Sequence, residues 1–368
     1  MSSLLSKLKK NSKIDLTEVL EKSELFNEKD MIPTDIPMLN VALSGSLEGG
    51  LTSGLTVLAG PSKHFKSSYS LIMASAYLKK YPDAVMMFYD SEFGSPQQYF
   101  KTFGIDTSRV LHIPIIDVEK LKFDLINQLN TIERGEKVII VIDSIGNLAS
   151  KKELEDAINE KSVGDMSRAK ALKGLFRMVT PYLTMKDLPM IAINHSYKTL
   201  EMYSKDVMSG GTGIYYSANA VWMLGRQQDK DKDAGLQGYH FVINIDKSRF
   251  VKEKSKIIIS VSFDGGVEKY SGLLEVAVLG GFVTKPTAGW YQKKDGADKY
   301  REKDTYSAEF WDPLLQNAEF KEFVKGCYTV GYRSMIDASA VGTTPESDKI
   351  SKADLVKLRH NDEDDDSE

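Results

Sequence analysis

The chain has 368 residues, of which 42% are hydrophobic and 27% are charged, and its formal net charge at pH 7 is -4. This composition is typical of a globular protein with a sizeable core, and the length allows two to three domains. The single cysteine, Cys327, excludes an intramolecular disulfide and a cysteine-rich metal site. Six carboxylates among the last eight residues account for the negative charge, so a nucleic-acid partner is not excluded.

The first 25 residues combine leucines at roughly helical spacing with lysines and acids, as in SLLSKLKKN. This pattern predicts one or two amphipathic helices, which we expect to form an N-terminal arm, residues 1–30, and not a separate domain. The arm lacks the apolar core of a signal peptide, and no stretch of about 18 consecutive apolar residues follows. We therefore expect a cytoplasmic protein with no membrane partner.

From Leu55 onward, short apolar runs alternate with helical stretches. The runs are LTVLAG (55–60), VMMFYD (85–90), VLHIPI (110–115), VIIVID (138–143), PMIAIN (189–194) and AVWMLG (220–225). Continuous apolar runs are typical of strands buried on both faces of a parallel sheet, and the stretches between them are long enough for crossover helices. The pattern predicts an α/β core, a mostly parallel sheet flanked by helices, over residues 31–292.

After Gly225 the pattern changes to that of a hairpin. The runs HFVINID and KIIISVSFD, separated by the basic segment KSRFVKEKSK, predict antiparallel strands at one edge of the sheet. The charged and aromatic residues that follow predict a small C-terminal domain over residues 293–358. The acidic stretch 359–368 is expected to be disordered.

The segment GPSKHFKSS lies between a predicted strand and a predicted helix, where backbone N–H groups and the helix dipole hold phosphates. Its spacing matches the phosphate-binding loop G-x-x-x-x-G-K-[ST], with Lys66 on the β- and γ-phosphates and Ser67 on Mg²⁺. Phe65 departs from this pattern, because a side chain where glycine is usual requires a negative φ or a shifted loop. An ordinary strand, loop and helix with two surface lysines is the alternative. The expected ATP-binding residues here are Gly60, Pro61, Ser62, Lys63, His64, Phe65, Lys66, Ser67 and Ser68.

Two acids follow predicted strands downstream. Asp143 is placed to orient the water shell of Mg²⁺, or else to cap the next helix. Glu92, in FYDSEFG, would lie beside the phosphate loop if the strands are neighbours, and could activate the water that attacks the γ-phosphorus. Asp90 is the competing acid, but alternation along its strand favours a structural position. Tyr99 is either an adenine platform or a core residue.

Seven segments, in this order and spacing, resemble those of the RecA family of DNA strand-exchange recombinases: GPSKHFKSS, FYDSEFG, VIIVIDS, INH (193–195), SGGTG (209–213), DKSR (246–249) and GWY (289–291). The resemblance covers about residues 26–292, and the C-terminal region resembles only the phage branch, whose phosphate loop also departs from the glycine rule. It implies a RecA-type P-loop ATPase core that uses ATP and Mg²⁺, with an N-terminal helical arm for polymerisation and a small C-terminal domain.

The resemblance also implies roles for individual residues. They are Lys66 for the phosphates, Ser67 and Asp143 for Mg²⁺, Glu92 as the catalytic carboxylate, and Tyr99 and Tyr270 for the nucleotide pocket. His195 stands where most of the family has the glutamine that senses the γ-phosphate, so coupling is expected to depend on pH. Taken alone, a histidine that ends a strand is a satisfied structural residue.

Lys247 and Arg249 resemble the pair of cations that RecA-type proteins insert into the nucleotide site of the neighbouring subunit. Cations two residues apart on a strand point to the same side, so both can face one interface. Positive charge supplied in this way makes hydrolysis depend on assembly. The alternative is a solvated basic hairpin.

Two polar segments, roughly 157–167 and 196–211, leave the carboxyl ends of predicted strands, the edge where ligands bind in open α/β folds. Backbone amides and cations there would follow DNA phosphates without reading sequence. Without the family resemblance, such charge runs are simply solvated faces. The expected DNA-binding residues are Arg168, Lys170, Lys173, Arg177, Lys198, Lys205, Gly210, Gly211 and Thr212.

Together these expectations describe an ATP-dependent recombination protein, serving repair and replication, that forms a helical filament on single-stranded DNA and exchanges strands with double-stranded DNA. Its partners would be further copies of the chain, a single-strand-binding protein and a recombination mediator, in the host cytoplasm if a phage encodes it. The acidic tail would compete with DNA for basic surface. Two alternatives remain open: a RecA-fold ring helicase, and a non-enzymatic ATP-binding mediator, which often lacks the water-activating acid.

Overall fold

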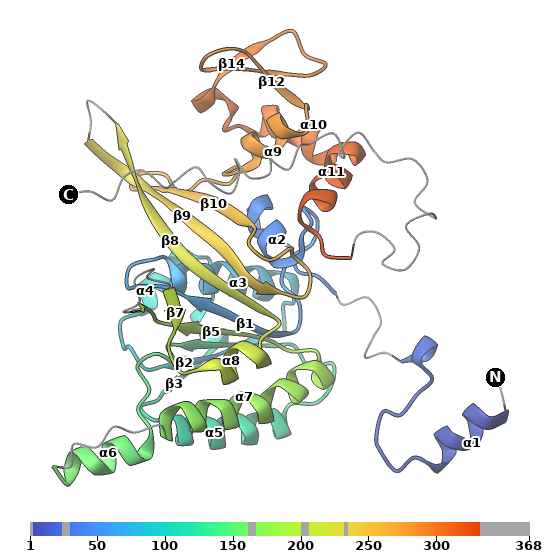
Figure 1. The fold of residues 1–368 in the computed structure, drawn as a ribbon, viewed down its shortest axis with the longest axis vertical. Helices are drawn as coiled ribbons and strands as arrows, with labels where there is room; N and C mark the ends of the chain where they lie inside the picture. Colours follow the sequence, from blue (N-terminus) through green and yellow to red (C-terminus); the bar gives the residue numbers. More distant parts are fainter. Residues whose placement is uncertain (1–2, 24–29, 161–166, 200–205, 232–234, 332–368) are drawn as a thin grey trace.

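A nine-stranded sheet in the order β11-β10-β9-β8-β1-β5-β4-β2-β3 forms the core of the protein (Figure 1). The computed structural model describes residues 3–23, 30–160, 167–199, 206–231 and 235–331. The strands are β1 (Gly54–Ala59), β2 (Val85–Asp90), β3 (Val110–Pro114), β4 (Val138–Asp143), β5 (Pro189–Asn194), β8 (Ala220–Asp231), β9 (Gly235–Ser248), β10 (Lys256–Ser262) and β11 (Gly266–Val267). Neighbours from β3 to β8 are parallel and those from β8 to β11 are antiparallel, so the predicted mostly parallel sheet is confirmed.

Helices cover both faces of this sheet because alternate side chains of the parallel strands face two separate cores. Met86 and Phe88 of β2 pack with α2 and α3 on one face. Met87 and Tyr89 of the same strand pack with α5 and α7 on the other face. These helices are α2 (Pro37–Ser44), α3 (Lys66–Lys80), α5 (Val118–Thr131) and α7 (Ser167–Lys186).

Shorter elements connect these strands and helices. They are α4 (Gln97–Thr102), the 3-10 turn η2 (Thr107–Arg109), α6 (Lys151–Ile158), β6 (Ser196–Lys198), β7 (Asp206–Met208) and α8 (Thr212–Ser217). The segment expected as a loop over 196–211 is therefore partly a two-stranded sheet, because β6 pairs antiparallel with β7. Residues 161–166 and 200–205, which include Lys205, lie outside the described residues, as does the acidic stretch 359–368.

The C-terminal part builds a second, small antiparallel sheet that packs with helices around the buried rings of Phe310, Trp311 and Phe320. Its elements are α9 (Leu273–Leu279), β12 (Val283–Thr287), β13 (Trp290–Lys293), β14 (Lys299–Arg301), η3 (Glu302–Thr305), α10 (Ala308–Gln316) and α11 (Ala318–Tyr328). The domain boundary expected after residue 292 thus falls within β13. At the other end, Figure 1 shows α1 (Ser3–Asn11) beside the core, followed by the turn η1 (Leu20–Lys22), and the leucines of α1 are exposed. Among the described helices, none is long and apolar enough to cross a membrane.

Candidate functional site

The carboxyl ends of four neighbouring strands bring the predicted catalytic side chains to one place. The loop after β1, Glu92 after β2, Asp143 at the end of β4 and His195 after β5 line a cavity of about 250 Å³. Tyr99 of α4 closes the same cavity. Residues as far apart in the sequence as Ser62 and His195 therefore form one site, because the ends of parallel strands share an edge of the sheet.

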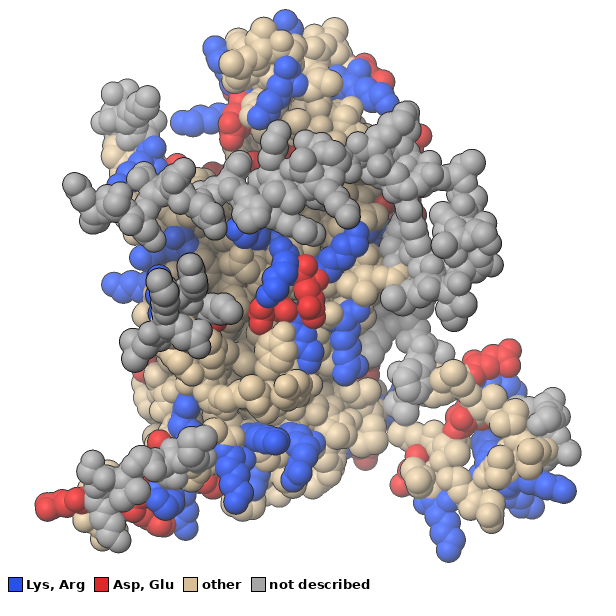
Figure 2. Space-filling model, viewed as in Figure 1, with Lys and Arg blue, Asp and Glu red and all other residues tan. Residues whose placement is uncertain are grey.

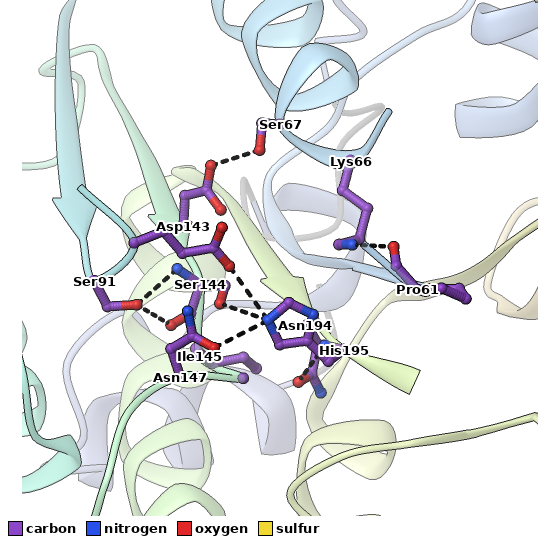
Figure 3. A network of polar contacts seen from close by, with 12 residues as sticks. Pro61, Lys66, Ser67, Ser91, Asp143, Ser144, Ile145, Asn147, Asn194 and His195 are labelled. Atoms are coloured by element: carbon purple, nitrogen blue, oxygen red, sulfur yellow. Dashed lines mark hydrogen bonds and ion pairs between the residues drawn. The ribbon is translucent and has the colours of Figure 1, made fainter. Parts of the chain in front are cut away.

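The loop lysine and the serine that follows it have different partners (Figure 3). Lys66 Nζ donates to the carbonyls of Gly60 at 3.0 Å and Pro61 at 2.6 Å, so the ammonium lies over its own loop. Ser67 Oγ donates to Asp143 Oδ2 at 2.7 Å. The buried Asp143 Oδ1 has no partner among the described residues, and burial raises the pKa of Asp143 to about 6. A hydroxyl beside a carboxylate with a free oxygen suits Mg²⁺, which prefers oxygen ligands.

Phe65 does not adopt the negative φ expected of a residue with a side chain at this position. The residue has φ 61° and ψ 17°, which is the left-handed conformation that glycine adopts at little cost. Its ring stacks on Phe241 with centroids 4.8 Å apart and meets Tyr69 edge to face at 5.2 Å. Strain of about 1–2 kcal/mol is thus offset by aromatic packing against β9 and α3.

Replacing Phe65 by glycine is expected to lower the free energy of unfolding by about 1–3 kcal/mol, because lost ring burial exceeds the relieved backbone strain. Phe65→Ala is the matched control: it loses the same ring but keeps the strain, and should be less stable than the glycine variant by about 1 kcal/mol. Urea denaturation measures both. A glycine variant as stable as the wild type would show that the ring contributes nothing.

The loop that carries Glu92 is held from both sides. Buried Asp90 accepts the N–H groups of Glu92 at 3.0 Å and Phe93 at 2.8 Å through Oδ1, and its Oδ2 faces His112 Nε2 at 3.1 Å. Asp90 is therefore structural, as strand alternation indicated. Glu92 Oε1 lies 3.2 Å from His195 Nε2, and this hydrogen bond is the main cause that lowers the pKa of Glu92.

Asn147 is a member of the site that sequence reasoning missed. Its Oδ1 lies 3.1 Å from His195 Nε2, and Ser144 Oγ lies 3.5 Å from the same nitrogen (Figure 3). Ser91 Oγ in turn accepts from the Ser144 N–H and donates to its carbonyl. A run of small polar residues after a strand-end aspartate was the available signal, but it is common in loops.

His195→Gln is expected to move the acidic limb of the pH profile of ATP hydrolysis to higher pH. Glu92 must be ionised to act as a base, so activity falls as pH drops through its pKa. Because His195 lowers that pKa, its removal lets the pKa of Glu92 return toward the ordinary value. Steady-state hydrolysis between about pH 3.5 and 7 measures the limb, because the ordinary pKa of a glutamate is about 4.3. An unchanged profile would show that the His195 contact does not control Glu92.

The two tyrosines expected in the nucleotide pocket have different surroundings. Tyr99 lines the cavity, and its hydroxyl lies 2.6 Å from Ser68 Oγ. A wider, mainly apolar groove of about 960 Å³ continues from Tyr99 and Phe65 along α3. Tyr270 does not line either space: its ring is buried and stacks on Trp311 at 6.3 Å. Tyr270 therefore packs against the C-terminal part of its own subunit, and its role in the nucleotide pocket stays a prediction.

Lys247 and Arg249 lie at the far end of β9 and do not line the cavity of their own subunit. Lys247 Nζ donates to the carbonyls of Tyr215 at 2.7 Å and Tyr216 at 3.1 Å, and burial lowers the pKa of this lysine. The backbone N–H of Arg249 donates to the Asn219 carbonyl, which holds the turn after β9 against the start of β8. Any contact of this pair with a nucleotide would therefore have to be made in another subunit.

The candidate DNA-binding residues divide into surface groups and one structural group. Lys170, Lys173 and Arg177 are exposed on α7, and Figure 2 shows Lys and Arg side chains gathered on this lower face. Lys198 is exposed on β6, and Thr212 begins α8 directly after Gly210 and Gly211, whose φ angles are 87° and 79°. Arg168 is the structural group: its guanidinium is partly buried and donates to the Leu148, Ile145 and Gly146 carbonyls and to Ser209 Oγ. Its contact with DNA stays a prediction.

The fold and the site define a P-loop nucleotide-binding protein, because a phosphate loop, a strand-end aspartate paired with the loop serine, and a nearby glutamate share one parallel-sheet edge. The RecA N-terminal domain family matches residues 6–268, and the family described as Bacteriophage T4, Recombination and repair protein, C-terminal domain, matches residues 270–324.

Individual relatives agree with both matches. The chain is 50% identical to the "Recombination and repair protein" of Enterobacteria phage T4, over 98% of this chain and 93% of that protein. It is 25% identical to "Protein RecA" of Streptomyces avermitilis over 74% and 71% of the two chains, and 23% identical to "Protein RecA" of Aquifex aeolicus over 72% and 75%. The chain therefore belongs to the RecA family of recombinases. The predicted family, fold class and recombinase function are confirmed.

Proposed function

We propose that the chain is a DNA-dependent ATPase that polymerises on single-stranded DNA and exchanges strands with homologous double-stranded DNA. The observation that supports this most directly is the cavity in which Lys66, Glu92 and Asp143 converge. The expected DNA-contacting segments leave the same sheet edge, so events at the nucleotide can reach them over a short path.

The residues of the cavity fit ATP and Mg²⁺. Ser67 and Asp143 would hold Mg²⁺, because one offers a hydroxyl and the other a buried oxygen without a partner among the described residues. When bound, Mg²⁺ supplies positive charge that neutralises phosphate oxygens. Lys66 would exchange its loop carbonyls for phosphate oxygens, and Tyr99 would support the base.

Glu92 and His195 would report on the γ-phosphate. Their 3.2 Å contact holds the carboxylate beside the histidine. This contact must break before either group can bind the substrate. Glu92 would orient and deprotonate the attacking water, while His195 would donate a hydrogen bond to the phosphate. His195 directly precedes β6, so its position also affects the segment proposed to contact DNA.

Subunits and DNA are the proposed partners. Lys247 and Arg249 lie away from their own cavity, which suits contact with the site of a neighbour in a head-to-tail filament. The exposed cations of α7 would follow the phosphates of the strand, and binding is then expected to weaken with salt. A single-strand-binding protein and a mediator are proposed to assist assembly.

The test is ATP hydrolysis measured with and without single-stranded DNA, with Lys66→Ala as the inactive control. We expect hydrolysis to rise on addition of single-stranded DNA and electron microscopy with an ATP analogue to show open helical filaments. Hydrolysis that does not respond to DNA would contradict the proposal. Closed rings would instead indicate the helicase alternative.

A further inference from the structure

Arg168 is tied into the protein by most of its hydrogen-bonding capacity. Its Nε donates to the Leu148 carbonyl at 2.6 Å, and one terminal nitrogen donates to the carbonyls of Ile145 at 2.9 Å and Gly146 at 2.8 Å. The other terminal nitrogen donates to Ser209 Oγ at 3.2 Å. Because a guanidinium has five N–H donors, the four bonds leave one donor for any further contact.

The carbonyls that Arg168 binds belong to the loop after β4. This loop follows the proposed Mg²⁺ ligand Asp143 and carries Asn147, which contacts His195 (Figure 3). The N–H of Ile145 also donates to the Ile193 carbonyl of β5, so the loop is bound to the strand that ends at His195. One side of the guanidinium is thus fixed to the nucleotide-facing edge of the sheet.

Ser209 connects the same guanidinium to the second DNA segment. The Ser209 N–H donates to the His195 carbonyl at 2.9 Å, and its own carbonyl accepts from Asn194 Nδ2 at 2.7 Å. Gly210 and Gly211 follow immediately. Arg168 itself lies near the start of α7, directly after residues 161–166 of the first DNA segment.

We infer that Arg168 is a positioning residue that couples the nucleotide site to both DNA-contacting segments, an inference that rests on the proposed function. A shift of His195 or of the loop after β4 moves the acceptors of one side chain, which follows the first DNA segment and contacts Ser209 near the end of the second. The guanidinium of Arg168 is required because its four acceptors lie in different directions and are bound by three different nitrogens. A lysine keeps the positive charge, but its single nitrogen cannot donate to all four acceptors.

Two substitutions at Arg168, with one matched control, separate coupling from DNA contact. Arg168→Lys keeps the positive charge and Arg168→Gln removes it, and we expect both to reduce the stimulation of ATP hydrolysis by saturating single-stranded DNA by at least about fivefold. Hydrolysis without DNA should stay near the wild-type rate. The slope of log affinity for single-stranded DNA against log salt should not change, because no phosphate contact is lost.

Lys170→Gln is the control, since this exposed lysine lies on the same helix. It should reduce the salt slope by about one while leaving the stimulation at saturating DNA unchanged. Ser209→Ala removes one of the four bonds to Arg168 and should lower the stimulation less than Arg168→Lys does. Thermal melting by circular dichroism verifies that each variant is folded.

Three results would overturn the inference. A normal Arg168→Lys variant together with a reduced salt slope for Arg168→Gln would make Arg168 a phosphate contact. Arg168 would have a purely structural role if its variants lost hydrolysis equally with and without DNA. The same conclusion would follow if both Arg168→Lys and Ser209→Ala failed to fold. If DNA did not stimulate ATP hydrolysis by the wild-type protein, the proposed function itself would be contradicted. The wild-type measurement alone shows this, so that failure is distinguished from a failure of the inference about Arg168.

Discussion

Glu92→Gln is expected to lower the rate of ATP hydrolysis about 10²- to 10⁴-fold, the usual loss when a general base is removed. The amide keeps the shape of the side chain, and the backbone N–H groups of residues 92 and 93 still donate to Asp90 Oδ1, but the amide cannot accept the proton of the attacking water. ATP binding should remain within a few-fold of wild type. Filaments of the variant should consequently persist in ATP, because hydrolysis no longer weakens them.

Single-turnover hydrolysis with saturating single-stranded DNA measures this effect, and equilibrium binding of a fluorescent ATP analogue measures the affinity. Glu155→Gln, an exposed glutamate on α6, is the matched control and should behave as wild type. If Glu92→Gln kept more than about a tenth of the wild-type rate, general-base catalysis would have to come from another group.

The double variant Lys247→Ala with Arg249→Ala is expected to lose hydrolysis about 10²- to 10³-fold, because two cations that stabilise transition-state charge are removed. The loss should be repaired by mixing with Glu92→Gln subunits. In such a mixture some interfaces pair an intact Glu92 of one subunit with the intact cations of its neighbour. At equal amounts and random assembly these are about a quarter of the interfaces.

The control for this mixing experiment is Lys66→Ala mixed with Glu92→Gln. Both changes lie on the cavity side of the interface, so no pairing of subunits restores a complete site. Activity is therefore expected in the first mixture and not in the second. Equal activity in both mixtures, or none in either, would contradict a site shared between subunits.

The sequence predicted the architecture because the apolar runs record burial on both faces of the sheet. It predicted the convergence of Glu92, Asp143 and His195 because the ends of parallel strands share an edge, which the topology then determines. The order of the strands and acidic residues along the chain was enough to predict that these side chains meet, without knowledge of any contact between them.

The remaining features depend on tertiary contacts that the sequence does not record. Arg168 has the charge of a DNA ligand, but the carbonyls that bind it come from the loop after β4. Tyr270 has the chemistry of an adenine platform, but Trp311 covers it from the C-terminal part. Phe65 keeps a glycine-like φ because Phe241, on β9, stacks on its ring. In each case a distant segment determines what the residue does.

Strand exchange between homologous DNA molecules is the reaction that a recombinase of this family must catalyse. Circular single-stranded DNA is mixed with homologous linear duplex, with or without ATP, and joint molecules are separated on a gel; a duplex of unrelated sequence is the control. We expect joint molecules when both ATP and homology are present, and none from the Lys66→Ala variant, in which Glu92 is intact. Unwinding of the unrelated duplex, or no joint molecules from the wild-type protein with ATP, would contradict this expectation.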